Sequence, residues 1–264
     1  MKIKDYLEKN YEDSLIALTY LLDTSKSYIL LNKDRVLTDK LANKLDQILK
    51  DRAKGKPLQY AIGYWEFFGL NLKVDKRALI PRFETEIIVD YIIKSDFKKK
   101  SILDIGTGSG AIALALASNI KETKILASDV KKEALDLAEI NRKRLGIENV
   151  SFVKSDLFEN ISGKFDIIVS NPPYINEDDY KKLDKVLYYE PKSALLAKED
   201  GLYYYKRIIK EANIYLNDGA MLIFEIGYDQ KDRIEKFLNE SDFKNIVCIK
   251  DYNDFDRFIV AEKG

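Results

Sequence analysis

From residue 101 onward, short apolar runs rich in β-branched residues alternate with longer segments of helical periodicity. Such runs have the length and composition of buried parallel strands, and their alternation with helices indicates an α/β fold. We therefore expect a seven-stranded, mainly parallel sheet with helices on both faces. Its strands are predicted at residues 102–105, 124–128, 150–154, 165–170, 220–225, 245–249 and 257–261. Because no helical segment separates the last two strands, we expect a terminal hairpin with one antiparallel edge strand.

The chain before this region has a different character. Residues 1–56 show helical periods and few strand signals, which predicts a small helical bundle. Thr38 suits the N-cap of a helix whose apolar stripe contains Leu41, Leu45, Ile48 and Leu49. Residues 66–74 predict a hairpin with Gly69 and Asn71 near its turn. We therefore divide the chain into three parts: a helical domain (1–56), a β-hairpin connector (57–82) and an α/β domain (83–264).

The charge and composition exclude several classes of chemistry. Lys and Arg together number 44, as do Asp and Glu, so a general nucleic-acid coat is disfavoured, although a local basic patch remains open. The chain has no histidine, which removes Ser-His-Asp catalysis and histidine-based metal sites, and we expect no metal. No long uncharged apolar run predicts a membrane span, and no apolar signal region opens the chain, so we expect a cytoplasmic protein.

A double proline follows the predicted strand at 165–170, in the sequence Asn171-Pro172-Pro173-Tyr174. Neither proline can donate to a sheet, so the chain must leave the sheet at Asn171, at the edge where open α/β sheets bind ligands. The Asn171 side-chain oxygen and the Pro172 carbonyl could accept hydrogen bonds from both N–H groups of an NH₂ group, while Tyr174 offers a ring for stacking. Taken alone, the stretch is equally compatible with a strand-ending turn in which Tyr174 is a packing residue.

A glycine-rich turn, Asp104-Ile105-Gly106-Thr107-Gly108-Ser109-Gly110, joins the first predicted strand of the α/β domain to a helix. Asp129 ends the next strand 21 positions after Gly108, where an acid can accept both hydroxyls of a ribose. These features alone allow either NAD or S-adenosyl-L-methionine (SAM).

Two further observations favour SAM. Asp104 precedes the glycines, where it could hold the loop or receive the methionine ammonium group through waters. Asp156 and Leu157 follow the third strand, where an acid could accept the adenine amino group and an apolar side chain could cover the ring. The predicted cofactor residues are therefore Asp104, Gly106, Thr107, Gly108, Ser109, Gly110, Asp129, Asp156, Leu157 and Asn171. Because Asn171 would lie beside the donated methyl group, we assign Asn171, Pro172 and Tyr174 as catalytic and expect S-adenosyl-L-homocysteine as the product.

The glycine loop and Asn171-Pro172-Pro173-Tyr174 together resemble the class I SAM-dependent amino-methyltransferases, which are Rossmann-like. Asn-Pro-Pro-Tyr is shared by DNA adenine and glutamine methyltransferases, so it indicates the reaction class and not the substrate. A closer resemblance, to the release factor glutamine methyltransferase family (PrmC/HemK), is carried by four segments. These are residues 66–70, 79–86, 190–195 and 201–206.

This resemblance implies methylation of the glutamine side-chain nitrogen in the Gly-Gly-Gln motif of bacterial peptide-chain release factors. The glutamine would be held by Asn171, Pro172, Pro173 and Tyr174 together with Arg82 and Glu84. The helical domain would recognise the release factor, and we expect a monomer with no direct nucleic-acid substrate. Phe83 departs from the family pattern, which has proline there, so the resemblance does not fix the geometry of this turn.

Three other readings compete with this one. An adenine amino-methyltransferase acting on DNA or RNA would need a basic channel and a base-reading domain. A glutamine methyltransferase acting on a ribosomal protein would typically have Ser-Pro after Pro81-Arg82, which this chain lacks. A non-catalytic SAM-binding or ribosome-associated module would have no use for an amine-orienting stretch at residues 171–174.

Overall fold

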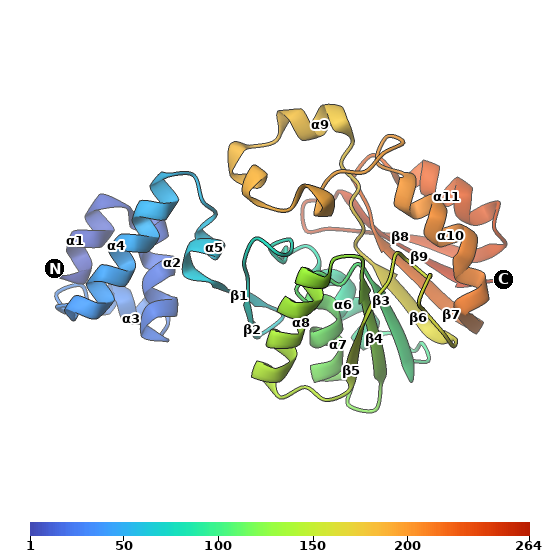
Figure 1. Cartoon of the computed structure of the whole chain (residues 1–264), viewed down its shortest axis with the longest axis horizontal. Helices are drawn as coiled ribbons and strands as arrows, with labels where there is room; N and C mark the ends of the chain where they lie inside the picture. Colours follow the sequence, from blue (N-terminus) through green and yellow to red (C-terminus); the bar gives the residue numbers. More distant parts are fainter. The chain divides into compact units, whose positions relative to one another are not determined.

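In the computed structural model, which describes residues 1–264, the chain forms two compact units (Figure 1). The first contains Met1–Trp65 and Asp184–Tyr189, and the second contains Glu66–Leu183 and Glu190–Gly264. The division differs from the boundaries at 56 and 82 that the sequence suggested. Its first unit also takes in helix α5 (Leu58–Ile62) and the beginning of the hairpin.

The first unit is built from short helices, as predicted. They are α1 (Ile3–Lys9), α2 (Tyr11–Leu22), α3 (Lys26–Leu31), α4 (Asp39–Ala53) and α5. The Thr38 hydroxyl accepts the Leu41 N–H at 3.4 Å and caps α4. Leu45 and Ile48 are buried in the apolar core of the unit, with Leu49 packed against it. The leucine stripe therefore holds α4 to the bundle through burial of its apolar face.

The predicted hairpin consists of β1 (Tyr64–Phe67) and β2 (Leu70–Lys73). Its turn residues, Phe68 and Gly69, have φ values of 48° and 73°, as the tight mirror-image turns of hairpins require. Asn71 is the second residue of β2, just after the turn, as expected. The Phe68 N–H donates to the Glu86 carboxylate at 2.9 Å, which attaches the turn to the start of α6 (Glu86–Lys94).

A seven-stranded sheet organises the second unit. Its strands, in the order in which they lie side by side, are β5 (Val150–Lys154), β4 (Lys124–Asp129), β3 (Ser101–Ile105), β6 (Phe165–Ser170), β7 (Leu216–Glu225), β9 (Asp256–Lys263) and β8 (Phe243–Lys250). The first five are parallel to one another, and β9 is antiparallel to both β7 and β8. The predicted mainly parallel sheet and terminal hairpin are thus confirmed.

The prediction that the antiparallel strand lies at the edge of the sheet is wrong. The antiparallel strand β9 lies inside the sheet, and β8 forms the edge. Residues Phe258, Ile259, Val260 and Ala261 of β9 are all buried, so this strand gains most from having a neighbour on each side. In β8, Val247 remains 51% exposed, as an edge position allows.

Helices cover both faces of the sheet (Figure 1). Helices α6 and α7 (Ala111–Asn119) pack with one apolar cluster, and α10 (Tyr203–Tyr215) and α11 (Lys231–Asn239) pack with another. Along β6, Ile167 and Val169 belong to the first cluster, whereas Ile168 belongs to the second, as expected of a strand buried on both faces. Helix α8 (Lys132–Leu145) follows β4, and none of the helices is long and apolar enough to cross a bilayer.

The segment between β6 and α10 contains structure that the sequence did not predict. It forms α9 (Glu177–Lys182) and two short 3₁₀ turns, Lys185–Tyr189 and Lys192–Ala194. The turn at Lys192–Ala194 lies at the carboxyl edge of the sheet, which is the edge where strands β3, β4, β5 and β6 end. The register pairs Ile105 with both Ser128 and Ser170, so the loops after β3, β4 and β6 begin side by side.

Candidate functional site

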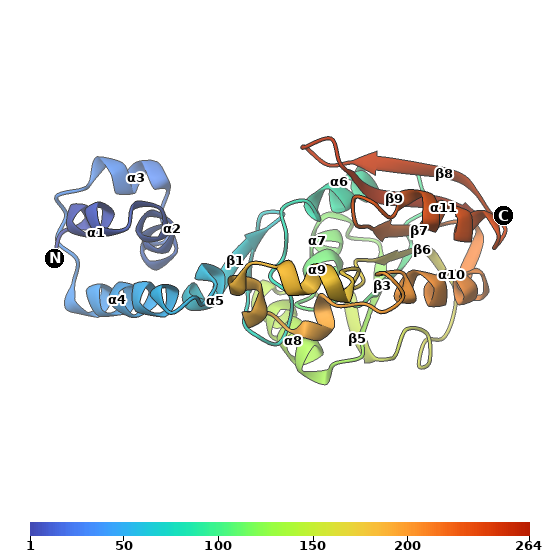
Figure 2. The same ribbon diagram turned by 90° about the horizontal axis from the view of Figure 1, so that it is seen from above.

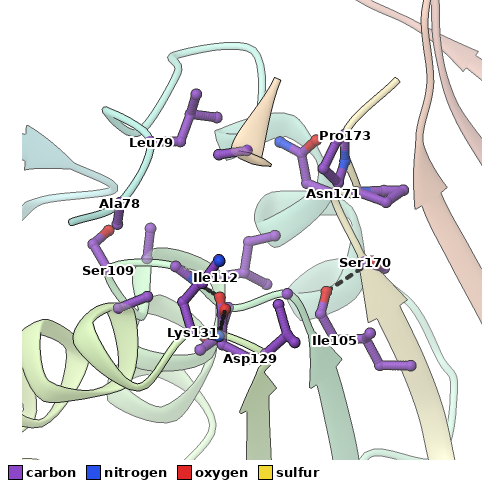
Figure 3. A pocket seen from close by; sticks show the side chains of 18 of the residues that line it. Ala78, Leu79, Ile105, Ser109, Ile112, Asp129, Lys131, Ser170, Asn171 and Pro173 are labelled. Carbon is purple, nitrogen blue, oxygen red and sulfur yellow. Dashed lines mark hydrogen bonds between the residues drawn. The ribbon is translucent and has the colours of Figure 1, made fainter. Parts of the chain in front are cut away.

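A cavity lies within the second unit at the carboxyl edge of the sheet (Figure 3). The loops that follow β3, β4, β5 and β6 line it, together with residues 77–82 and 191–194. Figure 3 shows Asn171 and Pro173 across the cavity from Asp129 and Lys131. The structure therefore brings the predicted glycine loop and the double proline to one site, although they are far apart in the sequence.

The glycine loop has two different roles. Gly106 and Gly108 line the cavity with φ values of 75° and 57°, and a Cβ at Gly106 would meet no protein atom within 4 Å. A ligand can thus approach the backbone there closely. Gly110 does not line the cavity. A Cβ at Gly110 would lie 3.0 Å from the Leu114 side chain and 3.2 Å from Ala138, so this glycine serves the packing of α7 against α8.

Asp104 lies beneath the glycine loop and is not among the residues that line the cavity. Its Oδ2 accepts a hydrogen bond from the Thr107 hydroxyl at 2.6 Å, while its Oδ1 has no hydrogen-bond partner in the protein. Burial raises the pKa of Asp104 to about 7. The hydrogen bond to Thr107 agrees with a role in holding the loop, and contact with the methionine ammonium group stays a prediction.

Asp129 occupies the wall of the cavity at the end of β4. Its carboxylate accepts the Gly108 N–H at 3.0 Å and the Lys131 N–H at 2.8 Å, so its orientation is fixed by the backbone. Burial raises the pKa of Asp129, and these N–H groups oppose the rise. The carboxylate retains lone pairs that can accept hydrogen bonds from hydroxyl groups.

Asp156 and Leu157 line the cavity from the turn after β5. The Ser155 hydroxyl shapes this turn because it donates to the Leu157 carbonyl at 2.8 Å and accepts the Asn160 N–H at 3.0 Å. The Arg207 guanidinium pairs with the Asp156 carboxylate at 3.0 Å. No local pattern predicts this ion pair, because Arg207 lies in α10, 51 residues further along the chain.

Asn171 is oriented by a chain of hydrogen bonds. Its Nδ2 donates to the Thr85 hydroxyl at 3.4 Å, and this hydroxyl donates to the Glu225 carboxylate at 2.6 Å. Thr85 and Glu225 are 4% and 2% exposed, so little solvent competes for these groups. Since the amide nitrogen faces Thr85, the amide oxygen has no protein partner and can accept a hydrogen bond from a ligand.

Sequence reasoning missed both Thr85 and Glu225. Glu225 ends strand β7 at the same sheet edge as Asp129, and that position was the available signal. Burial raises the pKa of Glu225 to about 7. No local pattern could link Glu225 to Thr85, because they are 140 residues apart.

Tyr174 differs from its predicted placement. Pro172 and Pro173 line the cavity, but Tyr174 does not, and its side chain packs against the apolar cluster beneath α10 and α11. Its carbonyl accepts a hydrogen bond from the Gln230 side chain at 3.0 Å, and burial raises the pKa of its hydroxyl. The turn at the double proline directs the ring toward the core, so the structure does not show it as a stacking surface for substrate.

Arg82 lies at the cavity wall, whereas Glu84 does not line the cavity. The Arg82 guanidinium donates to Glu190 at 2.7 Å, and the other Glu190 oxygen accepts the Ile80 N–H at 2.9 Å. The Glu190 side chain is 1% exposed. This buried carboxylate thus holds residues 80–82 beside residues 191–194, and both segments line the cavity.

Two family models match the chain. Residues 4–63 match the PrmC N-terminal domain, and residues 83–201 match the methyltransferase small domain. Among curated relatives, the release factor glutamine methyltransferase of Streptococcus pneumoniae is 41% identical over 273 residues, which cover 98% of each chain. That of Fusobacterium nucleatum is also 41% identical and spans 100% of this chain and 77% of the relative.

Solved structures support the assignment of the fold. A methyltransferase from Pyrococcus furiosus aligns with a TM-score of 0.57 at 23% identity, covering 84% of this chain and 99% of that chain. A ribosomal protein L11 methylase from Lactobacillus delbrueckii aligns with a TM-score of 0.50 at 26% identity, covering 70% and 79%. The predicted class I methyltransferase fold is therefore confirmed.

Proposed function

This chain belongs to the release factor glutamine methyltransferase family, and from that premise we propose that it methylates the side-chain nitrogen of a glutamine in a bacterial peptide-chain release factor, with SAM as methyl donor. One observation carries the proposal for the site. Asn171, whose amide oxygen has no protein partner while its amide nitrogen donates to Thr85, lines the same cavity as the glycine loop.

The residues of the cavity fit SAM. The open space beside Gly106 admits a ligand against the backbone, and Asp129 and Asp156 offer carboxylates at the ends of neighbouring strands. Asp129 would accept the ribose hydroxyls, Asp156 would accept the adenine amino group, and Leu157 would cover the adenine ring. When bound, SAM supplies a methyl group on a positively charged sulfur, and the product is S-adenosyl-L-homocysteine.

The remaining task of the site is to hold the glutamine carboxamide in one orientation. The Asn171 side-chain oxygen and the Pro172 carbonyl would accept hydrogen bonds from the two N–H groups of the carboxamide, as their position at the cavity allows. These bonds raise the electron density on a nitrogen that is otherwise a weak nucleophile, and they align it with the methyl group. Thr85 and Glu225 act as positioning residues, because they fix the rotation of the Asn171 amide.

Two of the three cations that line the cavity are already paired, which favours this function over methylation of a nucleic acid. Arg77 and Arg82 each pair with a carboxylate at 2.7 Å, from Asp75 and Glu190 respectively, which leaves Lys131 as the third cation. A nucleic-acid substrate would instead require free cations facing its phosphates. The proposed partner is thus a polypeptide, and the helical N-terminal domain, through its family match, is proposed to grip the release factor away from the glutamine.

A labelling experiment tests the proposed function. The protein is incubated with methyl-labelled SAM and either a release factor or duplex DNA or RNA. Label is expected in the release factor. Asn171→Ala should lower turnover by roughly two to three orders of magnitude while SAM binding changes much less.

A matched control is Asn176→Ala, which removes the N-cap of α9 and lies outside the residues that line the cavity. It should retain activity. Label in nucleic acid but not in release factor would refute the proposed function. An equal loss of turnover and SAM affinity in Asn171→Ala would show that Asn171 contacts the cofactor more than the glutamine.

A further inference from the structure

Four aromatic side chains of the second unit are largely exposed although they touch one another in pairs. Phe83, Tyr228, Tyr252 and Phe255 are 63%, 66%, 73% and 52% exposed. The rings of Phe83 and Tyr252 stack at 5.5 Å between centroids, and those of Tyr228 and Phe255 meet edge to face at 5.9 Å. We call these residues the aromatic patch. Resting on the proposed function, we propose that the aromatic patch docks the polypeptide that flanks the methylated glutamine.

The aromatic patch is held rigidly, as a docking surface requires. Asp251 accepts the N–H groups of Asn253 and Phe255 at 2.9 and 3.1 Å, which closes the turn between β8 and β9. Arg257 donates to Asp251 at 3.1 Å and to the Ile226 carbonyl at 3.2 Å. This arginine therefore joins the turn to the segment that carries Tyr228. The rings are presented to solvent by a fixed backbone, so binding to them orders little of the chain.

The aromatic patch adjoins the cavity. Phe83 lies between Arg82 and Thr85, which both line the cavity, and Thr85 contacts the Asn171 amide. Because consecutive Cα atoms are about 3.8 Å apart, the Cα atoms of Phe83 and Thr85 lie within roughly 8 Å. Figure 2 shows the turn between β8 and β9 beside the start of α6. A polypeptide that places a glutamine against Asn171 thus has neighbouring residues within reach of these rings.

The charges around the aromatic patch favour a polypeptide as its occupant. Lys250 pairs with Asp254 at 3.1 Å, and Arg257 pairs with Asp251 at 3.1 Å. Base stacking on aromatic side chains normally accompanies cations that contact phosphates, and these cations are already paired. Exposed aromatic rings beside paired cations suit apolar side chains and exposed backbone of a protein surface.

Two double variants test the docking role: Phe83→Ala with Tyr252→Ala, and Tyr228→Ala with Phe255→Ala. Steady-state methylation of an intact release factor gives KM and kcat, and calorimetry gives the Kd for SAM. Each double variant should raise KM about tenfold and change kcat by less than about twofold, because the lost contacts act in binding and not in the reaction. The Kd for SAM should be unchanged. Ile214→Ala, at a 66% exposed position in α10 of the same unit, is the matched control and should change none of these values.

The outcomes separate this inference from the proposed function. If the unaltered protein does not methylate release factor, the proposed function fails, and the docking role fails with it. If the unaltered protein is active and both double variants keep its KM, the docking role alone is overturned. A changed Kd for SAM, or a fall in kcat without a rise in KM, would show a structural role and overturn it equally. The same holds if the double variants only abolish self-association in sedimentation, since the patch would then join two copies of this chain.

Discussion

Glu225 gives a prediction whose magnitude follows from its burial. The carboxyl is 2% exposed, and its pKa rises from 4.5 to about 7 in the folded protein. A difference of about 2.5 pKa units corresponds to about 3 kcal/mol between the two protonation states. Below about pH 4.5 this carboxyl is protonated in both folded and unfolded chains and has no unfavourable effect. As the pH rises toward 7, Glu225 ionises in the unfolded chain before it ionises in the folded chain. The free energy of unfolding therefore falls progressively over this range.

The perturbation is Glu225→Gln, which cannot ionise and retains an oxygen that can accept the Thr85 hydroxyl. The free energy of unfolding of this variant, relative to the unaltered protein, should rise by about 3 kcal/mol between about pH 4 and about pH 8. Urea unfolding followed by circular dichroism at several pH values measures this difference. Glu122→Gln, at an exposed position, is the control and should give a nearly constant difference. A flat profile for Glu225→Gln would refute the raised pKa of this buried carboxyl.

Three further substitutions test other parts of the site. Thr85→Val removes the hydroxyl that receives the Asn171 amide, so kcat should fall about tenfold while the Kd for SAM stays constant, as steady-state kinetics and calorimetry would measure. Asp129→Asn should weaken SAM binding by about 10- to 100-fold in calorimetry, because hydrogen bonds to a charged acceptor are lost. Gly201→Ala would place a Cβ 2.1 Å from the Tyr174 carbonyl oxygen, and the free energy of unfolding in urea should fall by about 2 kcal/mol or more.

Each of these has a control that isolates the proposed cause. Thr85→Ser keeps the hydroxyl and should keep most of the activity, so equal losses in Thr85→Ser and Thr85→Val would argue against the orienting hydrogen bond. Asp136→Asn removes a carboxylate on the exposed side of α8 and should leave SAM affinity unchanged. Gly163→Ala has a φ of 89° but no atom within 4 Å, so it reports backbone strain alone. A loss in Gly163→Ala as large as that in Gly201→Ala would contradict a role for the contact with Tyr174.

The sequence revealed those features of the fold that depend on neighbouring residues. The strand that ends at Ser170 was predictable because an apolar run is followed by two residues that cannot pair in a sheet. Asp129 and Asp156 could be placed at the ligand-binding edge because each lies within two residues of the end of a predicted strand. The inside position of β9 was not predictable, because a hairpin at the end of a sheet can join through either of its strands.

The orienting contacts of the site escaped prediction because they join distant segments. The Glu225 carboxylate and the Thr85 hydroxyl come into contact only when β7 and the start of α6 have packed together. Neither residue type predicts such a contact. The direction of the Tyr174 ring was misjudged for a related reason. A double proline shows that the chain turns, but packing against the core under α10 determines which way the next side chain points.

The location of the transferred methyl group tests the central claim most directly. A release factor is treated with the protein and SAM, digested, and analysed by tandem mass spectrometry. One methyl group is expected on the side-chain nitrogen of a single glutamine, and the initial yield from Asn171→Ala should be lower by roughly two to three orders of magnitude. A methyl group on a different residue type, or an equal yield from Asn171→Ala, would contradict it.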